Sequence, residues 1–110
     1  MHFFITGHTG FKGTWLTHLL RNRGHVVSGY SDIAELGSLF TTTDTGDLLK
    51  NDFRGDVRDL DTLSKAILKA SPEILIHLAA QSLVPKSYLY PFETFSINVD
   101  GTRNVLAATK

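Results

Sequence analysis

The chain has 110 residues and a mass of 12.2 kDa, which is enough for one ordinary domain and leaves no room for a second, substrate-binding one. Its composition, 42% hydrophobic and 20% charged, allows a packed core and excludes intrinsic disorder. Eleven basic and eleven acidic residues give a formal net charge of zero, so we expect neither nucleic acid nor an anionic membrane as a partner.

The first half of the chain predicts a strand, a helix and a second strand. The apolar run 2–6 ends at a glycine and predicts a strand that is buried on both faces, as in a parallel sheet. Helical spacing predicts an amphipathic helix over residues 11–23, with Gly24 where it would stop. Its apolar stripe is Phe11, Trp15, Leu16, Leu19 and Leu20. We expect a second strand at 26–30, and then a mostly irregular stretch over 31–51 with at most one short helix.

Strands and helices continue to alternate in the second half. A short third strand and turn are expected at 52–56, a helix capped by Asp59 over 59–70, and a fourth strand at 73–78. A last helix is predicted over 92–110, with Phe95, Val99, Val105 and Leu106 as its apolar residues. This alternation predicts a doubly wound, Rossmann-like parallel α/β sheet in the order 3-2-1-4. Because that fold continues past its fourth strand, we expect residues 1–110 to form only its first part, with strand four as an open edge.

A glycine-rich turn joins the first strand to the first helix. It reads Gly-His-Thr-Gly-Phe-Lys-Gly over residues 7–13. A dinucleotide pyrophosphate requires glycine for a sharp turn, for close approach of backbone amides, and for close packing of a helix whose positive end faces the anion. We therefore predict a dinucleotide-binding loop made of Gly7, His8, Thr9, Gly10, Phe11, Lys12 and Gly13. The alternatives are that the glycines only shape the turn and that Lys12 is solvated without reaching a phosphate.

This loop is not an ATP-hydrolysing Walker loop, because Lys12 precedes a glycine instead of following one. An NAD site normally has an acidic residue at the end of the second strand, about twenty residues past the glycines, that binds the adenosine ribose. Ser31 and Asp32 lie at this place, with Asp32 one residue late and no Arg or Lys beside it for the 2′-phosphate of NADP. These residues favour NAD; the alternative is that Asp32 is a solvated loop carboxylate.

Four segments together resemble the extended short-chain dehydrogenase/reductases, the family of NAD-dependent sugar-nucleotide epimerases and dehydratases. They are residues 6–13, Gly-Asp-Val-Arg-Asp at 55–59, His-Leu-Ala-Ala-Gln at 77–81 and Asn-Val-Asp-Gly-Thr at 98–102. The loop 7–13, the triplet 38–40 and residues 79–84 are most similar to the CDP-glucose 4,6-dehydratase branch. The chain departs from the family pattern at Pro85-Lys86 and at Asp100, which replaces an apolar residue.

The resemblance implies a role for individual residues. The pyrophosphate would lie on the loop 7–13 and the adenine against Asp56 and Val57. The nicotinamide side would be lined by Leu78, Ala79, Ala80 and Gln81, with Asn98 bracing that strand end. Asp56 follows a strand at the edge where ligands bind in open α/β sheets, and alanines let a flat ring approach. The structural alternatives are Asp56 as a turn or capping residue, Asn98 as a helix-face amide and Gln81 as a loop residue.

The resemblance also implies a chemistry. Such dehydratases oxidise the sugar at C4 by hydride transfer to bound NAD, with a tyrosine base and a lysine that lowers its pKa, then eliminate water across C5 and C6 and return the hydride. No tyrosine here has a lysine four residues on, so we expect no catalytic residue in this chain and the catalytic pair beyond Lys110. The expected cofactor is NAD, the complete enzyme's substrate CDP-glucose, and the assembly a homodimer through helix 92–110. The alternatives are an NAD-binding module without catalysis, and a GDP-mannose dehydratase or UDP-hexose epimerase.

Other chemistries and compartments find no support in the sequence. The five histidines lack the spacing of metal ligands, and no serine-hydrolase GxSxG motif occurs. The chain has no cysteine, no signal peptide and no run of about 20 apolar residues, so we expect it in the cytoplasm. The open sheet edge and the uncovered helix faces predict self-association or poor solubility.

Overall fold

A four-stranded parallel sheet forms the centre of the computed structural model, which describes residues 1–110. Its strands are β1 (His2–Thr6), β2 (Val26–Ser31), β3 (Asn51–Arg54) and β4 (Ile74–His77). They pair in the order β3-β2-β1-β4, with Phe4 of β1 opposite Ser28 on one side and Leu75 on the other. The predicted fold class and strand order are confirmed, and β4 lies at an edge of the sheet.

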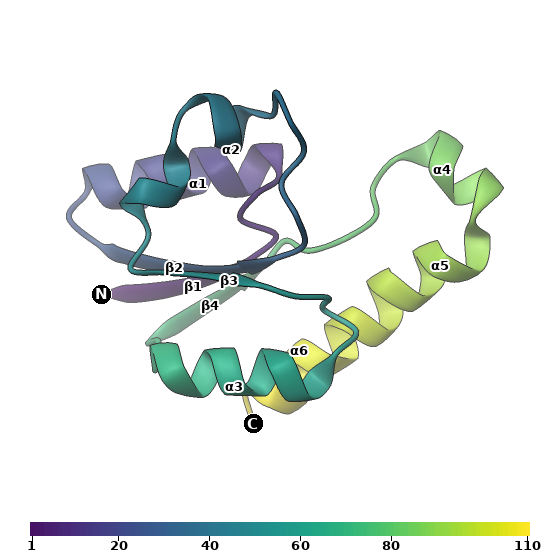
Figure 1. The fold of residues 1–110 in the computed structure, drawn as a ribbon. Helices are drawn as coiled ribbons and strands as arrows, with labels where there is room; N and C mark the ends of the chain where they lie inside the picture. Colours follow the sequence, from purple (N-terminus) through teal and green to yellow (C-terminus); the bar gives the residue numbers. More distant parts are fainter.

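Helices cover both faces of the sheet. Figure 1 shows α1 (Phe11–Asn22) and the short α2 (Leu39–Thr42) on one face, and α3 (Leu60–Ala70) with α6 (Gly101–Ala108) on the other. A 3₁₀ turn, Thr45–Leu48, follows α2. Right-handed crossovers explain this division, since the chain moves outward from β1 to β3 and then returns across the sheet to β4.

Helix α3 begins and ends as the sequence predicted. The carboxylate of Asp59 accepts a hydrogen bond from the Thr62 backbone amide at 3.2 Å and so caps the first turn. Ser71, at the other end, adopts a left-handed conformation with φ of 47°, and Pro72 follows it.

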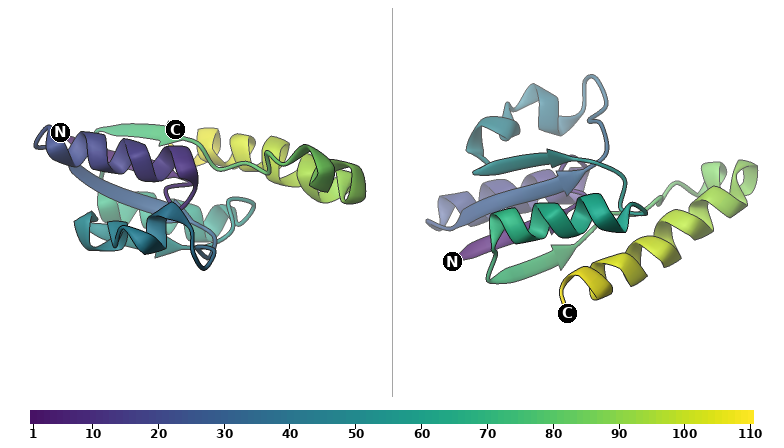
Figure 2. Two further views of the ribbon diagram at one scale, coloured as in Figure 1. Left: turned by 90° about the horizontal axis from the view of Figure 1, so that it is seen from above. Right: turned by 60° about the horizontal axis from the view of Figure 1, so that its bottom comes forward.

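The C-terminal helix differs from the single helix predicted over 92–110. It consists of α5 (Pro91–Phe95), a π-helical turn (Ser96–Asp100) and α6, and it is preceded by an unpredicted helix α4 (Val84–Leu89). Six residues are too short to display a helical period, although Pro85 stands in the first turn of α4, where proline is favoured. Figure 2 shows α4 and α5 extending away from the sheet, while α6 lies beside α3.

The core has one part on each face of the sheet. The larger part lies between the sheet, α3 and α6 and comprises Phe4, Tyr30, Val57, Leu63, Ala66, Ala70 and Val105. The smaller part lies under α1 and comprises Ile5, Leu20 and Val27. No helix combines the length and the apolar character needed to cross a membrane.

The predicted apolar stripe of α1 is only partly its buried face: Leu20 is buried and Leu16 packs against the smaller core. Phe11, Trp15 and Leu19 are 70%, 58% and 50% exposed, whereas small residues face the sheet. Those buried residues are Gly13, Thr14 and Thr17, together with Leu20. Small side chains let the helix lie close to the glycine-rich loop, and both threonine hydroxyls are satisfied by donating to the backbone carbonyls of His8 and Gly13, at 3.3 and 2.8 Å.

The apolar residues predicted for the last helix are also mostly outside. Phe95, Val99 and Leu106 are exposed, and only Val105 is buried, in the larger core. The apolar face of this helical segment therefore points away from the sheet.

Candidate functional site

A cleft of about 890 Å³ opens at the carboxyl ends of the strands, where ligands bind in open α/β sheets. It is lined by the loop after β1, the end of β2, the turn after β3, the segment after β4 and the π-helical turn. All the predicted site residues except His8 line it. These are Gly7, Thr9, Gly10, Phe11, Lys12, Gly13, Ser31, Asp32, Asp56, Val57, Leu78, Ala79, Ala80, Gln81 and Asn98. The structure thus brings together side chains from five separate parts of the chain.

The three glycines of the loop have distinct environments. Gly7 has a φ of +78°, and a Cβ there would lie 2.7 Å from the backbone nitrogen of Ala79. A Cβ on Gly13 would strike the carbonyl oxygen of Gly7, so only glycine allows α1 to start this close to the loop. At Gly10 a Cβ would have only an ordinary contact, 3.4 Å from the Gly7 oxygen, beside the open cleft. The first turn of α1 therefore presents unobstructed backbone to the cleft.

His8 is the exception among the predicted loop residues. Its side chain is fully buried beside β2, where a Cβ on Gly29 would collide with the ring. Nε2 lies 2.7 Å from a carboxylate oxygen of Asp52 on β3, and the ring makes an edge-on contact with Phe40. Burial lowers the pKa of His8, and Asp52 partly opposes this effect. The side chain fastens the loop to the sheet instead of facing the cleft.

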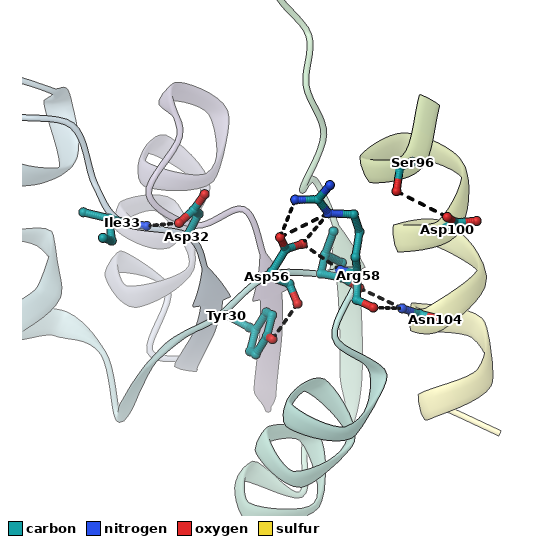
Figure 3. A network of polar contacts seen from close by, with 9 residues as sticks. Tyr30, Asp32, Ile33, Asp56, Arg58, Ser96, Asp100 and Asn104 are labelled. Atoms are coloured by element: carbon teal, nitrogen blue, oxygen red, sulfur yellow. Dashed lines mark hydrogen bonds and ion pairs between the residues drawn. The ribbon is translucent and has the colours of Figure 1, made fainter. Parts of the chain in front are cut away.

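Polar contacts hold the end of β2 against the loop. The hydroxyls of Thr9 and Ser31 are 2.8 Å apart, and Asp32 follows them on the rim of the cleft. One Asp32 carboxylate oxygen accepts the backbone amide of Ile33 at 2.7 Å, which fixes the orientation of the side chain (Figure 3). Arg54 donates to the Asp32 carbonyl at 3.0 Å and to Asp52, also at 3.0 Å. This arginine is therefore already engaged by two acceptors.

Asp56 forms an ion pair with Arg58, and both residues line the cleft (Figure 3). The Arg58 guanidinium donates to both carboxylate oxygens, the shortest contact being 2.6 Å, and the Arg58 amide donates to one of them at 2.9 Å. These hydrogen bonds hold the pKa of Asp56 below its usual range. The sequence left open that Asp56 is only a turn residue, and its contact with the Arg58 amide is of that kind. This carboxylate therefore both lines the cleft and stabilises its own turn.

The backbone of the same turn is held from two other elements (Figure 3). The buried Tyr30 hydroxyl donates to the Asp56 carbonyl at 2.8 Å, and burial raises the pKa of Tyr30 to about 12. The buried amide of Asn104, on α6, donates to the carbonyls of Val57 and Arg58 at 3.1 and 2.9 Å. Strand β2 and helix α6 together fix the position of Asp56 and Val57.

The backbone of Gln81 and the side chain of Asn98 form two reciprocal hydrogen bonds. The Gln81 amide donates to Asn98 Oδ1 at 2.8 Å, and Asn98 Nδ2 donates to the Gln81 carbonyl at 3.1 Å. The Gln81 side chain donates to Leu83 and Thr94, at 3.1 Å each. Asn98 thus holds this segment through two hydrogen bonds, while contact of either residue with a cofactor stays a prediction.

Sequence reasoning missed several residues of the cleft, among them Tyr30, Arg58, His77 and Thr102. A signal was present for three of them: Tyr30 and His77 lie at the ends of strands, and Arg58 is two residues from a predicted site carboxylate. Thr102 is brought in only by the docking of α6, which local sequence does not specify. No group of three or more His, Asp or Glu side chains is arranged to hold a metal ion.

Comparison with known proteins finds sugar-nucleotide dehydratases by sequence and epimerases by structure. The model of the GDP-mannose 4,6 dehydratase family matches residues 4–110. The chain is 45% identical, over 108 residues, to the CDP-glucose 4,6-dehydratase of Salmonella typhimurium, a match that covers 97% of this chain and 30% of that protein. The structure of the Thermus thermophilus UDP-glucose 4-epimerase complex with NAD matches with a TM-score of 0.84 and 29% identity, over 98% of this chain and 33% of that one.

A second solved structure, the Bifidobacterium longum UDP-glucose 4-epimerase in complex with NAD⁺ and UDP, matches over 98% of this chain and 33% of that one, with a TM-score of 0.79 and 26% identity. The chain thus spans about a third of the length of these relatives. Because the family model matches almost every residue and the fold agrees, the chain belongs to the GDP-mannose 4,6 dehydratase family, among the sugar-nucleotide dehydratases and epimerases that its four motifs resemble.

Proposed function

We propose that this chain is the NAD-binding amino-terminal part of a sugar-nucleotide 4,6-dehydratase that acts on CDP-glucose. The observation that carries the proposal is the cleft at the carboxyl ends of the strands, with Gly10 open to it at the start of α1. The 45% identity to a CDP-glucose 4,6-dehydratase supports the choice of substrate. NAD bound there would supply a hydride acceptor for the sugar.

The residues of the cleft fit a dinucleotide. The loop at the start of α1 offers backbone amides and a helix end of positive polarity to the pyrophosphate, without a side chain in the way at Gly10. Asp32 lies on the rim with a fixed carboxylate for a ribose diol, and the engagement of Arg54 by other acceptors favours NAD over NADP. Asp56 and Val57 would hold the adenine, and residues 78–81 the nicotinamide side.

Titration calorimetry of the 110-residue chain with NAD and with NADP tests the binding proposal. We expect saturable binding of NAD and weaker binding of NADP. Gly10→Val should weaken NAD binding about tenfold or more, because its side chain enters the space for the pyrophosphate while its φ of −75° suits any residue. Gly46→Ala is the matched control, since its Cβ would make only ordinary contacts with Asp52 and Phe40, away from the cleft. If the chain is folded but does not bind NAD, the proposal is wrong and the glycines only shape the turn between β1 and α1.

A chimaera tests the enzymatic part of the proposal. No tyrosine of this chain has a lysine four residues on, so we expect the chain to bind NAD without turning over CDP-glucose. Joined in place of the matched segment to the remainder of the Salmonella CDP-glucose 4,6-dehydratase, it should restore dehydration of CDP-glucose, and the same chimaera with Gly10→Val should not. A stable chimaera that binds NAD but does not dehydrate CDP-glucose would favour the alternative, an NAD-binding module without catalysis.

A homodimer is the proposed assembly. The residues Phe92, Phe95, Val99 and Leu106 form the exposed apolar face of the helical segment 91–108. The segment projects from the sheet, so this face is accessible to the same face of a second copy (Figure 2). Two-fold pairing of such helices would bury both faces.

A further inference from the structure

The imidazole of His77 lies between two threonine hydroxyls at the end of β4. It lines the cleft, and in the sheet it is the residue opposite Thr6 of β1. Its Nδ1 is 2.6 Å from Thr6 Oγ1, and its Nε2 is 3.2 Å from Thr102 Oγ1 on α6. The ring therefore connects the sheet to the last helix.

The hydrogen bonds of Thr6 and Thr102 together indicate which ring nitrogen of His77 carries the proton. The Thr6 hydroxyl oxygen accepts the backbone amide of Ala79 at 3.3 Å and, at 3.1 Å, that of Leu78, which also donates to the Thr6 carbonyl at 3.0 Å. The Thr6 hydrogen is left to donate to Nδ1, and this arrangement has Nδ1 unprotonated. Nε2 carries the hydrogen and donates it to Thr102.

The same order continues into the helix. The Thr102 hydroxyl donates its own hydrogen to the Asn98 carbonyl at 2.7 Å, so its oxygen is left to accept from the ring. The side chain of Asn98 is the group that holds Gln81 on the wall of the cleft. Each donor in the series Thr6, His77, Thr102 thus has an acceptor, and the series ends at the pair formed by Asn98 and Gln81.

We propose that His77, as the neutral tautomer with hydrogen on Nε2, is a positioning residue that ties β4 to the helical segment 96–108 and thereby holds the Asn98–Gln81 wall of the cleft. The consequence for ligand affinity rests on the proposed binding of NAD; the tautomer and the link to Asn98 do not. His77 acts here through Thr102 and Asn98 and is not assigned a chemical step.

Protonation of His77 would disturb this arrangement, because a hydrogen on Nδ1 would take the place of the hydrogen that the Thr6 hydroxyl donates there. Burial is the one cause that lowers the pKa of His77. The charged or titratable groups of the surrounding elements are His2 on β1, Lys12 on α1, Asp100 and Arg103 at the start of α6, and Asp56, Arg58, Lys86 and Glu93 around the cleft. None of them is among the causes of the shift, and Asp100 and Arg103 pair with each other at 3.8 Å.

The first test is the ring ¹⁵N NMR spectrum of His77 in the free chain near pH 7.5, with assignment by a His77→Gln variant. The expected spectrum shows a neutral ring with hydrogen on Nε2 and a pyridine-like Nδ1. A ring with hydrogen on Nδ1, or a charged ring at that pH, would overturn the proposal. This measurement needs no ligand, so it stands whether or not NAD binds.

The second test compares Thr102→Val with Thr102→Ser. We expect Thr102→Val to reduce hydrogen-exchange protection of the Gln81 amide and to weaken NAD binding about fivefold, the effect of one net hydrogen bond, and we expect Thr102→Ser to restore both. Thr109→Val is the matched control, because the Thr109 hydroxyl also donates to the carbonyl four residues back but contacts no histidine. Unchanged Gln81 protection in folded Thr102→Val would contradict the proposed link.

The third readout is the pH profile of NAD affinity, which a purely structural role would not change. Wild-type affinity should fall as the pH drops below about 6.5, the ordinary histidine value, and His77→Gln should remove that component of the fall. Identical profiles would overturn the positioning role. If the wild-type chain binds no NAD at any pH while the tautomer and the Gln81 protection are as expected, the proposed function fails and the positioning role stands.

Discussion

Gly7 owes its identity to the backbone of the segment that follows β4. Its φ of +78° disfavours any other residue, and a Cβ would in addition meet Ala79 nitrogen and Leu78 carbon at 2.7 and 2.8 Å. Gly7→Ala should therefore lower the free energy of unfolding by about 3 kcal/mol or more, since backbone atoms cannot move aside cheaply. Urea denaturation followed by circular dichroism measures this loss.

Gly24 supplies the control for Gly7. It has a φ of +83°, but nothing lies within 4 Å of its Cβ position, so Gly24→Ala isolates the cost of the backbone conformation. We expect that cost to be about 1 kcal/mol. Equal losses in the two variants would show that contact with the end of β4 is not what requires glycine at position 7.

His8 and Gly29 are predicted to be energetically coupled. A Cβ on Gly29 would collide with the His8 ring, so Gly29→Ala should cost about 2 kcal/mol or more through overpacking. In His8→Ala that ring is gone, and the added methyl group of Gly29→Ala should then cost much less. A double-mutant cycle in urea should give a coupling energy of about 1–3 kcal/mol. Strict additivity of the two single variants would refute the direct contact.

The sequence predicted most of the residues that line the cleft because the glycine loop and the ends of parallel strands meet at one edge. It did not predict the direction of individual side chains. His8 lies inside the loop motif, yet its ring turns to Asp52, a residue 44 positions away, because the missing side chain at Gly29 leaves space for it. Such a cavity depends on two strands being paired, which local sequence does not express.

Helix α6 controls the turn after β3 through Asn104. This side chain is only 4% exposed and donates to the carbonyls of Val57 and Arg58. Asn104→Leu keeps the size of the side chain but leaves both carbonyls without their donor, so we expect a loss of about 2–3 kcal/mol in the free energy of unfolding. Arg103→Ala, one residue earlier and mostly exposed, should change it by less than about 0.5 kcal/mol. A loss in Asn104→Leu as small as that in Arg103→Ala would show that α6 does not fix this turn.

At the scale of elements, periodicity located the longer helices α1 and α3 but gave the buried face of α1 only in part. The helix at 11–22 was predicted nearly to its ends, yet Trp15 and Leu19 face outward and Thr14 and Thr17 face the sheet. An apolar stripe on a helix predicts the face that is buried. Where α1 packs closely against the glycine-rich loop, however, only small residues fit. Hydrophobicity alone therefore identifies Leu16 and Leu20 on the core side of α1 and misses its small buried residues.

For the whole molecule, the histidines predict acid sensitivity. Burial lowers the pKa values of His2, His8 and His77 in the folded chain from the ordinary value of 6.5. The unfolded chain therefore binds more protons below that value, so the associated stability is fully present above about pH 6.5 and is lost as the pH falls. Urea denaturation should give level free energies of unfolding from about pH 8 to pH 7 and a decline toward pH 5. A level profile down to pH 5 would contradict the direction of these shifts.

The arrangement of apolar residues in the whole molecule predicts how the chain associates. Two separate apolar surfaces are exposed: Phe11, Trp15 and Leu19 on α1, and Phe92, Phe95, Val99 and Leu106 on the C-terminal helical segment; β4 is also an open edge. If the C-terminal face forms the proposed dimer, Phe95→Glu should convert a dimer to monomer in sedimentation velocity, since each interface would receive two buried carboxylates. Trp15→Glu should leave that dimer intact and reduce only higher association. A dimer that survives Phe95→Glu but not Trp15→Glu would place the interface on α1 instead.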